Sequence, residues 1–138
     1  MPVPRILIVD DEASILSLLR LVLESENYEV GTAVSAAEAT QKLAEERFDL
    51  IITDIRMETP TAGFEVVRTA RRNSPEVPVA LLTAFPVPTS DWKQAGADAL
   101  FMKGMDSTLK MLEWIQGALS GKLKPEEHSA QQAKKQAS

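Results

Sequence analysis

Short apolar runs alternate with amphipathic segments along this chain. The runs are rich in aliphatic and β-branched residues, as buried strands are, and they cover 5–9, 29–33, 48–54, 79–83 and 99–102. The other segments place apolar residues at helical spacing and cover 13–25, 35–46, 63–72, the stub 89–95, and 106–119. The pattern therefore predicts five strands and five helices in strict alternation.

This alternation determines the fold class. Strands that alternate with helices form a parallel sheet with helices on both faces, which is a doubly wound α/β fold. Right-handed crossovers and a short second strand at one edge favour the strand order 2-1-3-4-5. In such a sheet, ligands bind beyond the carboxyl ends of the strands where the winding direction reverses, here between the first and third strands.

Some helices carry boundary signals, and two have a clear apolar stripe. Ser35 and Glu38 form a capping box for the second helix, and Asp106 or Ser107 is expected to cap the last one. The expected buried stripe of the first helix is Ile15, Leu18, Leu19, Val22 and Leu23. That of the last helix is Leu109, Leu112, Ile115 and Leu119. We expect Trp92 and Trp114 to be packing residues.

Acidic side chains directly follow two predicted strands. Asp10, Asp11 and Glu12 follow the first strand, and Asp54 ends the third. These two strands are neighbours in the predicted order, so their carboxyl ends should bring the acids together. Three carboxylates within about 5 Å repel by roughly 3 kcal/mol per pair at an effective dielectric near 20, so a cation must offset them.

The residue types around these acids indicate what they bind. Oxygen ligands without nearby His or Cys favour a hard divalent ion, and an open site with few carboxylates suits Mg²⁺. Thr83 and Lys103 end the fourth and fifth strands and should emerge at the same edge. Two cations, Mg²⁺ and the Lys103 ammonium, together with the Thr83 hydroxyl and a carboxylate, suit the binding of a tetrahedral anion.

Composition limits the classes of partner. The 138 residues, 44% hydrophobic and 25% charged, are typical of one globular domain. Residues 1–121 have a net charge of −7, which disfavours direct binding of nucleic acid, whereas 122–138 have +2. Without cysteine, signal peptide or membrane-length apolar segment, we expect a cytoplasmic protein with no membrane contact. We expect residues 1–121 to form the domain and 122–138 a flexible C-terminal tail.

Four motifs resemble the signatures of the response-regulator receiver domain of two-component signalling. They read ILIVDDE at 6–12, LIITDIRM at 50–57, LLTA at 81–84 and GADALFMK at 96–103. They occur in the family's order on the expected strands, and the resemblance covers about residues 4–120. It implies the flavodoxin-like (βα)5 fold of a stand-alone, CheY-like receiver.

The resemblance also implies a function, that of a phosphoryl acceptor in a phosphorelay rather than an enzyme. Asp54 would accept a phosphoryl group from a phosphohistidine of a sensor histidine kinase or phosphotransfer protein. Thr83 and Lys103 would each bind a phosphoryl oxygen, and the change would pass to a downstream protein. The implied Mg²⁺ ligands are Asp11, Asp54, the backbone carbonyl of Arg56 and, through water, Asp10.

Two departures from the family pattern lie near Lys103. Gly104 stands where the family usually has proline, so we predict a trans Lys103–Gly104 bond and a looser approach of Lys103. Leu100 takes the place of the aromatic residue that usually moves with the threonine. Phe85 is its candidate substitute.

The loops after the third and fourth strands also depart from the pattern. The segment from Asp54 to Gly63 is one residue longer than usual, with Glu58 where proline is common. The segment from Thr83 to Gly96 is about two residues short and shortens the fourth helix. Because many receivers dimerise through that helix, we predict that this protein does not use that dimer.

Three other interpretations stay open on the sequence alone. The chain fits a fragment of a longer regulator or hybrid kinase. It also fits a degenerate receiver that binds partners without phosphorylation, as Leu100 and Gly104 suggest. An aspartate-nucleophile phosphohydrolase also places an Asp after a buried strand. Those enzymes have an Asp-x-Asp motif, however, and here Arg56 stands where the second Asp of that motif would be.

Overall fold

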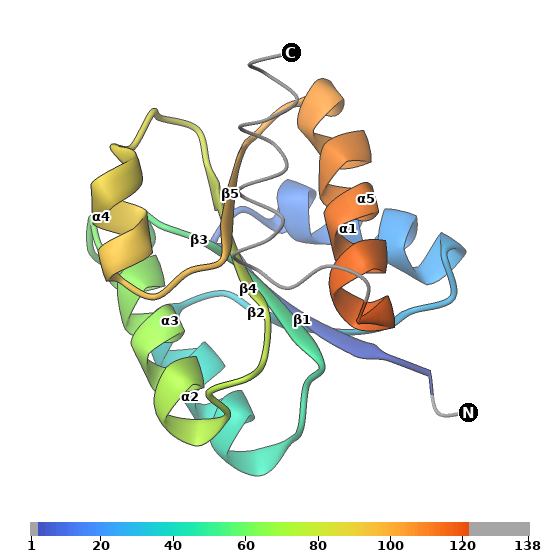
Figure 1. Ribbon diagram of the computed structural model, residues 1–138, viewed down its shortest axis with the longest axis horizontal. Coiled ribbons are helices and arrows are strands. Elements are labelled where there is room, and N and C mark those ends of the chain that lie inside the picture. The colour runs from blue at the N-terminus through green and yellow to red at the C-terminus, as the bar shows by residue number, and fades with distance from the viewer. Residues whose placement is uncertain (1–2, 122–138) are drawn as a thin grey trace.

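The architecture alternates five strands with five helices (Figure 1). The structure is a computed structural model, and it describes residues 3–121, so the predicted tail at 122–138 lies outside the described residues. The strands are β1 (Arg5–Val9), β2 (Glu29–Ala33), β3 (Leu50–Asp54), β4 (Val79–Thr83) and β5 (Ala99–Met102). The helices are α1 (Ala13–Ser25), α2 (Ala36–Glu45), α3 (Ala62–Asn73), α4 (Thr89–Gln94) and α5 (Met105–Ser120).

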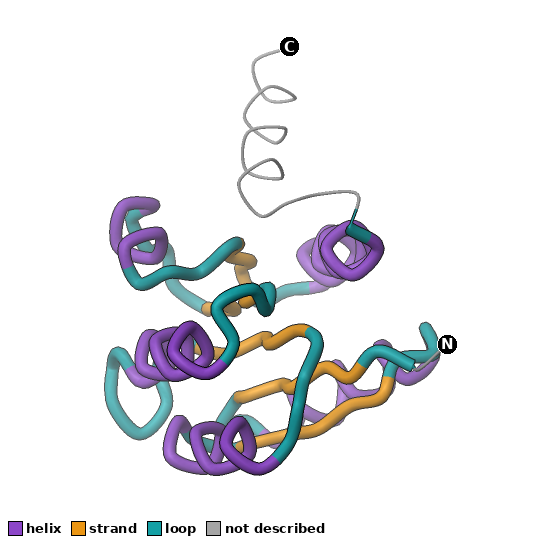
Figure 2. Tube along the Cα trace, turned by 60° about the horizontal axis from the view of Figure 1, so that its bottom comes forward, coloured by secondary structure: helices purple, strands orange, loops and turns teal. Residues whose placement is uncertain are grey.

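The strands form one parallel sheet in the order β2-β1-β3-β4-β5, which confirms the predicted fold class and topology. Figure 2 shows the strands in orange between the purple helices. The register aligns their carboxyl ends. Val9 pairs with Thr53, so the residues that follow β1 lie beside the end of β3. On the other side, Asp54 pairs with Leu82. The acids predicted from β1 and β3 therefore emerge at one edge of the sheet.

Two cores hold the sheet between its helices. α1 and α5 cover one face, and α2, α3 and α4 lie on the other (Figure 1). Successive residues of β1 point to opposite cores: Ile6 and Ile8 pack under α1 and α5, whereas Leu7 and Val9 pack under α2 and α3. Because the central strands β1, β3 and β4 are buried on both faces, they read as continuous apolar runs in the sequence.

The predicted cap and stripe of the last helix are partly wrong. α5 begins at Met105 with Gly104 at its N-cap position, earlier than the predicted cap at Asp106 or Ser107. Leu109 is 68% exposed, and Met111 and Trp114 are buried in its place. Trp114, confirmed as a packing residue, meets Phe101 edge-on with ring centroids 6.1 Å apart. This large ring sets which face of α5 turns inward.

The stripe of α1 shows the same kind of error. Leu18 is 51% exposed, whereas Leu16, which was not predicted, is buried. Leu19 and Leu23 are buried as predicted. Apolar residues lie on nearly every side of this helix, so the spacing alone does not fix which side faces the sheet.

Candidate functional site

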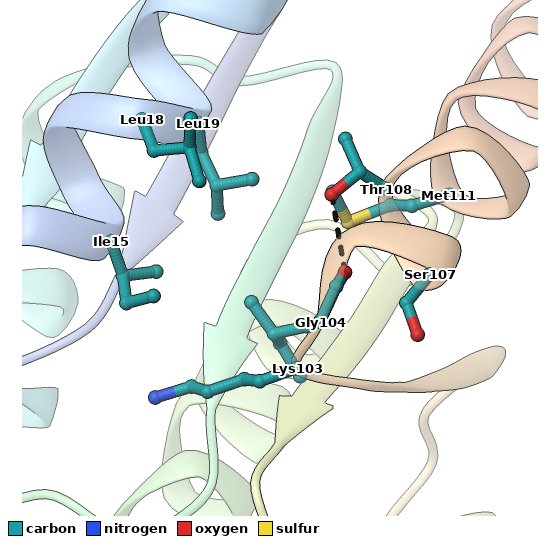
Figure 3. Close-up of a pocket in the computed structure, with 9 residues that line it drawn as sticks. Ile15, Leu18, Leu19, Lys103, Gly104, Ser107, Thr108 and Met111 are labelled. Atoms are coloured by element: carbon teal, nitrogen blue, oxygen red, sulfur yellow. Dashed lines mark hydrogen bonds between the residues drawn. The ribbon is translucent and has the colours of Figure 1, made fainter.

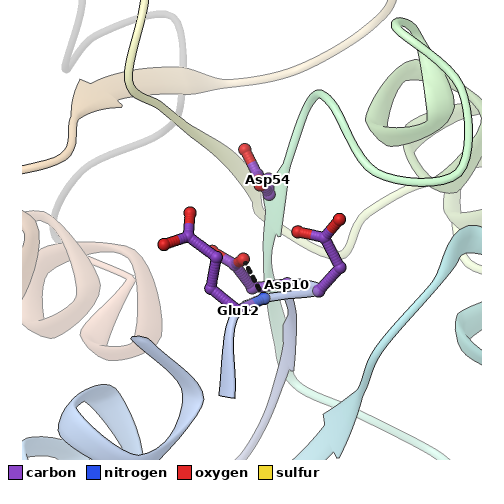
Figure 4. A group of neighbouring side chains, drawn as sticks. Asp10, Glu12 and Asp54 are labelled. Atoms are coloured by element: carbon purple, nitrogen blue, oxygen red, sulfur yellow. Dashed lines mark hydrogen bonds between the residues drawn. The ribbon is translucent and has the colours of Figure 1, made fainter. Parts of the chain in front are cut away.

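Four acidic side chains meet at the carboxyl ends of β1 and β3 (Figure 4). Asp10, Asp11, Glu12 and Asp54 each offer a carboxylate oxygen, and these oxygens lie within 4.8 Å of one another. Asp10 and Asp54 are buried, while Asp11 and Glu12 are exposed. The structure therefore brings together the three aspartates predicted to form a cluster and adds Glu12.

Backbone hydrogen bonds hold the turn that carries three of these acids. The Asp10 amide donates to the Ala33 carbonyl at 3.0 Å, which continues the pairing of β1 with β2 by one residue. Asp10 Oδ1 then accepts from the Glu12 amide at 2.9 Å, so its side chain closes the turn. One carboxylate oxygen of Asp10 is used in this way, and the other remains for the site.

Asp54 is the last residue of β3, and its surroundings fix the side chain. It is 6% exposed, and its Oδ1 accepts from the Ile55 amide at 2.9 Å. The start of α3 packs directly behind it, where the Gly63 amide donates to the Ile55 carbonyl at 2.8 Å. A Cβ at Gly63 would lie 2.1 Å from the Asp54 carbonyl oxygen, so this close approach needs glycine.

Lys103 supplies the positive charge of the cluster. Its Nζ lies 3.0 Å from Asp10 Oδ2, 2.8 Å from Glu12 Oε1 and 3.2 Å from Asp54 Oδ2. The Lys103 amide donates to the Thr83 carbonyl at 2.7 Å, which extends the pairing of β4 with β5 and aims the side chain across the edge. The peptide bond to Gly104 is trans as predicted. The predicted looser approach of Lys103 is wrong, since the ammonium group reaches three carboxylates.

Asp54 and Lys103 both have raised pKa values, for different reasons. Burial raises the pKa of Asp54 to about 6, the charge of Asp10 adds to this effect, and Lys103 opposes it. Burial lowers the pKa of Lys103, but hydrogen bonds and charges of Glu12, Asp10 and Asp54 outweigh this effect and leave it above its ordinary value. One ammonium group thus contacts three of the four clustered carboxyl groups, so the acids outnumber their positive partner.

The donor set fits a hard divalent cation. Every ligating atom in the cluster is a carboxylate oxygen. Asp10 Oδ2 is buried, and its one contact among the described residues is with Lys103 Nζ at 3.0 Å. A buried carboxylate oxygen with a single partner has lone-pair capacity left for a metal ion or a metal-bound water. Mg²⁺, the predicted ion, agrees with these ligands.

Thr83 lies at the end of β4 but does not hydrogen-bond to the acids. Its hydroxyl donates to the Phe85 carbonyl at 3.0 Å and accepts from the Phe85 amide at 3.1 Å. Phe85 is 55% exposed, and the Arg56 guanidinium lies 5.0 Å from the centre of its ring. Arg56 and Phe85 thus connect the loop after Asp54 with the loop after Thr83.

An apolar cavity of about 180 Å³ lies beside Lys103, between α1 and α5 (Figure 3). Ile15, Leu19 and Met111 line it together with the stem of Lys103. On its far side the Thr108 hydroxyl donates to the Gly104 carbonyl at 3.4 Å. Apolar surroundings of this kind favour an extended lysine stem whose ammonium group points to the acids.

Two contacts were missed by the sequence analysis. Glu12 was noted only as one more acid near the aspartates, although its place directly after Asp10 and Asp11 was the available signal. Glu58 was noted only as a departure from a family pattern, and the structure shows that it binds the start of α2. No local pattern signals that second contact, since Glu58 and Ala36 are 22 residues apart.

Comparison of the sequence with known proteins identifies its relatives. A family model described as "Response regulator receiver domain" matches residues 6–113. The transcriptional regulatory protein ResD of Bacillus subtilis is 45% identical over 80 residues, covering 58% of this chain and 32% of ResD. GlrR of Escherichia coli is 42% identical over 80 residues, covering 58% of this chain and 18% of GlrR. The chain therefore matches about a third or less of the length of these relatives.

Solved structures match over most of their length. A CheY-like response regulator receiver domain protein from Methanospirillum hungatei is 33% identical with a TM-score of 0.78, over 87% of this chain and 96% of that one. The response regulator protein TrrA from Thermotoga maritima, solved in complex with Mg²⁺ and BeF, is 34% identical with a TM-score of 0.76. That match covers 84% of this chain and 99% of TrrA.

A separate observation concerns membranes. Within residues 3–121, no helix has both the length and the apolar character that a membrane crossing requires.

Proposed function

Because the chain belongs to the response-regulator receiver domain family, we propose that Asp54 is its phospho-acceptor. The donor would be a phosphohistidine of a sensor histidine kinase or of a phosphotransfer protein, and the receiver unit would span residues 1–121. One observation carries this proposal: a buried carboxylate lies among three other acids, with Lys103 Nζ 3.2 Å from its Oδ2.

The chemistry is an in-line transfer to a carboxylate oxygen. A pKa of about 6 leaves Asp54 mostly ionised at pH 7, so it can act as a nucleophile. An oxygen–phosphorus bond to Asp54 forms as the nitrogen–phosphorus bond of the donor breaks, and the electron pair leaves with the imidazole. Positioning and charge neutralisation supply most of the catalysis of such transfers, and Lys103 is placed to neutralise phosphoryl oxygens.

The acids would hold the magnesium ion that this reaction uses in the family. The ligands would be Asp11, Asp54 and the Arg56 backbone carbonyl, with Asp10 acting through a water. When bound, the ion neutralises charge on the phosphoryl oxygens. The cluster of carboxylates and the buried Oδ2 of Asp10, whose one contact within residues 3–121 is the Lys103 ammonium, support this assignment. So does TrrA, whose structure contains Mg²⁺ and BeF.

Thr83 would report the phosphorylated state. Its hydroxyl now binds the backbone of Phe85, and binding a phosphoryl oxygen would require it to leave those partners. The loop after β4 would then rearrange, together with the exposed Phe85 ring and the Arg56 side chain against it. A downstream protein that reads this loop would detect phosphorylation at Asp54.

Incubation with a small phosphodonor tests the proposal. With Mg²⁺ and acetyl phosphate, the protein should gain a single phosphoryl group, about 80 Da by mass spectrometry. Asp54→Asn should gain none. Asp49→Asn is the matched control, since Asp49 precedes the same strand at its other end, where it binds the Arg5 amide, and this variant should react as the wild type does.

Two results would contradict the phospho-acceptor function. An unmodified wild-type protein would support the phosphorylation-independent binding module instead. Continuous turnover of ordinary phosphate monoesters would support the phosphohydrolase.

A further inference from the structure

Glu58 makes a contact that links the loop after Asp54 to another part of the molecule. This loop, residues 55–61, joins β3 to α3. Glu58 Oε1 accepts from the Ala36 amide at 2.9 Å, and Oε2 accepts from the Ala37 amide at 3.1 Å. Ala36 and Ala37 are the first two residues of α2, so a side chain distant in the sequence caps this helix.

The first three amides of α2, those of residues 36–38, thereby find acceptors from two sources. Ser35, the local N-cap residue, accepts from the Glu38 amide through its Oγ at 3.0 Å, as the sequence predicted. The Ser35 carbonyl accepts from the Ala39 amide at 3.0 Å. Glu58 provides the acceptors for the remaining two amides of this first turn. Its carboxylate also lies at the end of the helix where a negative charge is favoured.

The loop has few other ties. Its remaining hydrogen bonds, among the described residues, stay within 54–64, including Met57 amide to Thr59 carbonyl at 3.0 Å and Gly63 amide to Ile55 carbonyl at 2.8 Å. The ring contact of Arg56 involves an exposed Phe85. The bidentate contact of Glu58 is thus the loop's hydrogen-bonded connection to a rigid element outside β3 and α3.

We propose that Glu58 is a positioning residue for the metal site: by fastening the loop to α2, it holds the Arg56 backbone carbonyl where a magnesium ligand is needed. This inference rests on the proposed function, in which that carbonyl is a ligand. Only one residue separates Arg56 from Glu58, so a backbone movement at Glu58 also displaces the Arg56 carbonyl. By linkage, magnesium binding at the site stabilises the contact between Glu58 and α2 to the same extent.

Ser35 provides a matched control for the test. Ser35→Ala removes one cap from the same turn of α2 without touching the loop, whereas Glu58→Ala removes both the cap and the loop's attachment. Both changes should lower the melting temperature by similar amounts. Glu58→Gln keeps one good acceptor oxygen and serves as a variant of intermediate effect.

Calorimetric titration of each full-length variant with Mg²⁺ measures the proposed role. Glu58→Ala should bind Mg²⁺ about threefold to tenfold more weakly than the wild type, below the roughly 10- to 100-fold loss typical when a ligand's direct outer partner is removed. The Mg²⁺ affinity of Glu58→Gln should lie between those of Glu58→Ala and the wild type. That of Ser35→Ala should stay within about twofold of the wild type. In the wild type, Mg²⁺ should also slow hydrogen exchange at the Ala36 and Ala37 amides.

The outcomes separate this inference from the function on which it rests. Unchanged Mg²⁺ affinity in Glu58→Ala, or an equal loss in Ser35→Ala, would overturn the role of Glu58 while leaving the metal site intact. A wild-type protein that does not bind Mg²⁺ would overturn the proposed function, and this inference with it.

Discussion

Replacing Asp54 with asparagine should make the metal-free protein more stable. The substitution keeps the shape of the side chain and removes one negative charge from a cluster of four carboxyl groups, three of which contact the Lys103 ammonium. The remaining ion pairs do not depend on the substituted side chain, because Lys103 retains Asp10 and Glu12. The residue that the proposed chemistry needs most is therefore unfavourable for folding without a metal ion.

The pKa of Asp54 gives the size and sign of this effect. Folding raises it from 3.8 to about 6, and each pKa unit corresponds to about 1.4 kcal/mol. The folded protein holds the Asp54 proton to higher pH than the unfolded chain does. The contribution of this proton to the free energy of unfolding is therefore full below pH 3.8 and is lost as pH rises through 6. At pH 7 the ionised wild type should be less stable than Asp54→Asn by about 2–3 kcal/mol, or roughly 6–10 °C in melting temperature.

Urea unfolding with a chelator present measures the difference. At pH 7 the Asp54→Asn variant should unfold at higher urea, and its advantage should shrink below about 1 kcal/mol near pH 4. Added Mg²⁺ should stabilise the wild type more than the variant, since binding favours the folded state. An Asp54→Asn protein no more stable than the wild type at pH 7, or a difference that does not change with pH, would refute the reasoning.

Three further predictions concern neighbours of Asp54. Lys103→Met should lower the stability of the metal-free protein by about 2–4 kcal/mol in urea unfolding, because its carboxylate partners lose their counter-ion. Mg²⁺ should restore part of this loss, and an unchanged stability would contradict the ion-pair assignment. Gly63→Ala should destabilise by more than about 2 kcal/mol in the same assay, since its Cβ would meet the Asp54 carbonyl at 2.1 Å, and a neutral result would contradict that close approach. Phe85 ring resonances should shift when beryllofluoride and Mg²⁺ bind, and Thr83→Ala should reduce that shift; unchanged Phe85 resonances would rule it out as the reporter.

The sequence predicted that Asp10, Asp54 and Lys103 lie close together, because strand ends are local features. Asp10, Asp54, Thr83 and Lys103 each end or directly follow a short apolar run, and a parallel sheet brings such ends to one edge. Strand order then determined which ends are neighbours. No contact between distant side chains had to be assumed.

Contacts that depend on side-chain direction could not be predicted in this way. Leu18 and Leu109 were assigned to the core because both helices are apolar on several sides, and the packing of Trp114 and other large residues decides which side turns inward. Glu58 caps a helix 21 and 22 residues before it, and the sequence contains no period that relates the two. Lys103 approaches the acids closely although Gly104 replaces the usual proline, because the hydrogen bond to Thr83 already directs its backbone.

Locating the phosphoryl group within the chain is the most direct test of the central claim, that Asp54 is a metal-assisted phospho-acceptor. After reaction with acetyl phosphate and Mg²⁺, borohydride reduces an aspartyl phosphate to homoserine, and peptide sequencing by mass spectrometry then identifies the modified position. We predict homoserine at position 54 alone, and none when Mg²⁺ is removed by a chelator. Homoserine at another aspartate, or none at all in the presence of Mg²⁺, would contradict the assignment of Asp54.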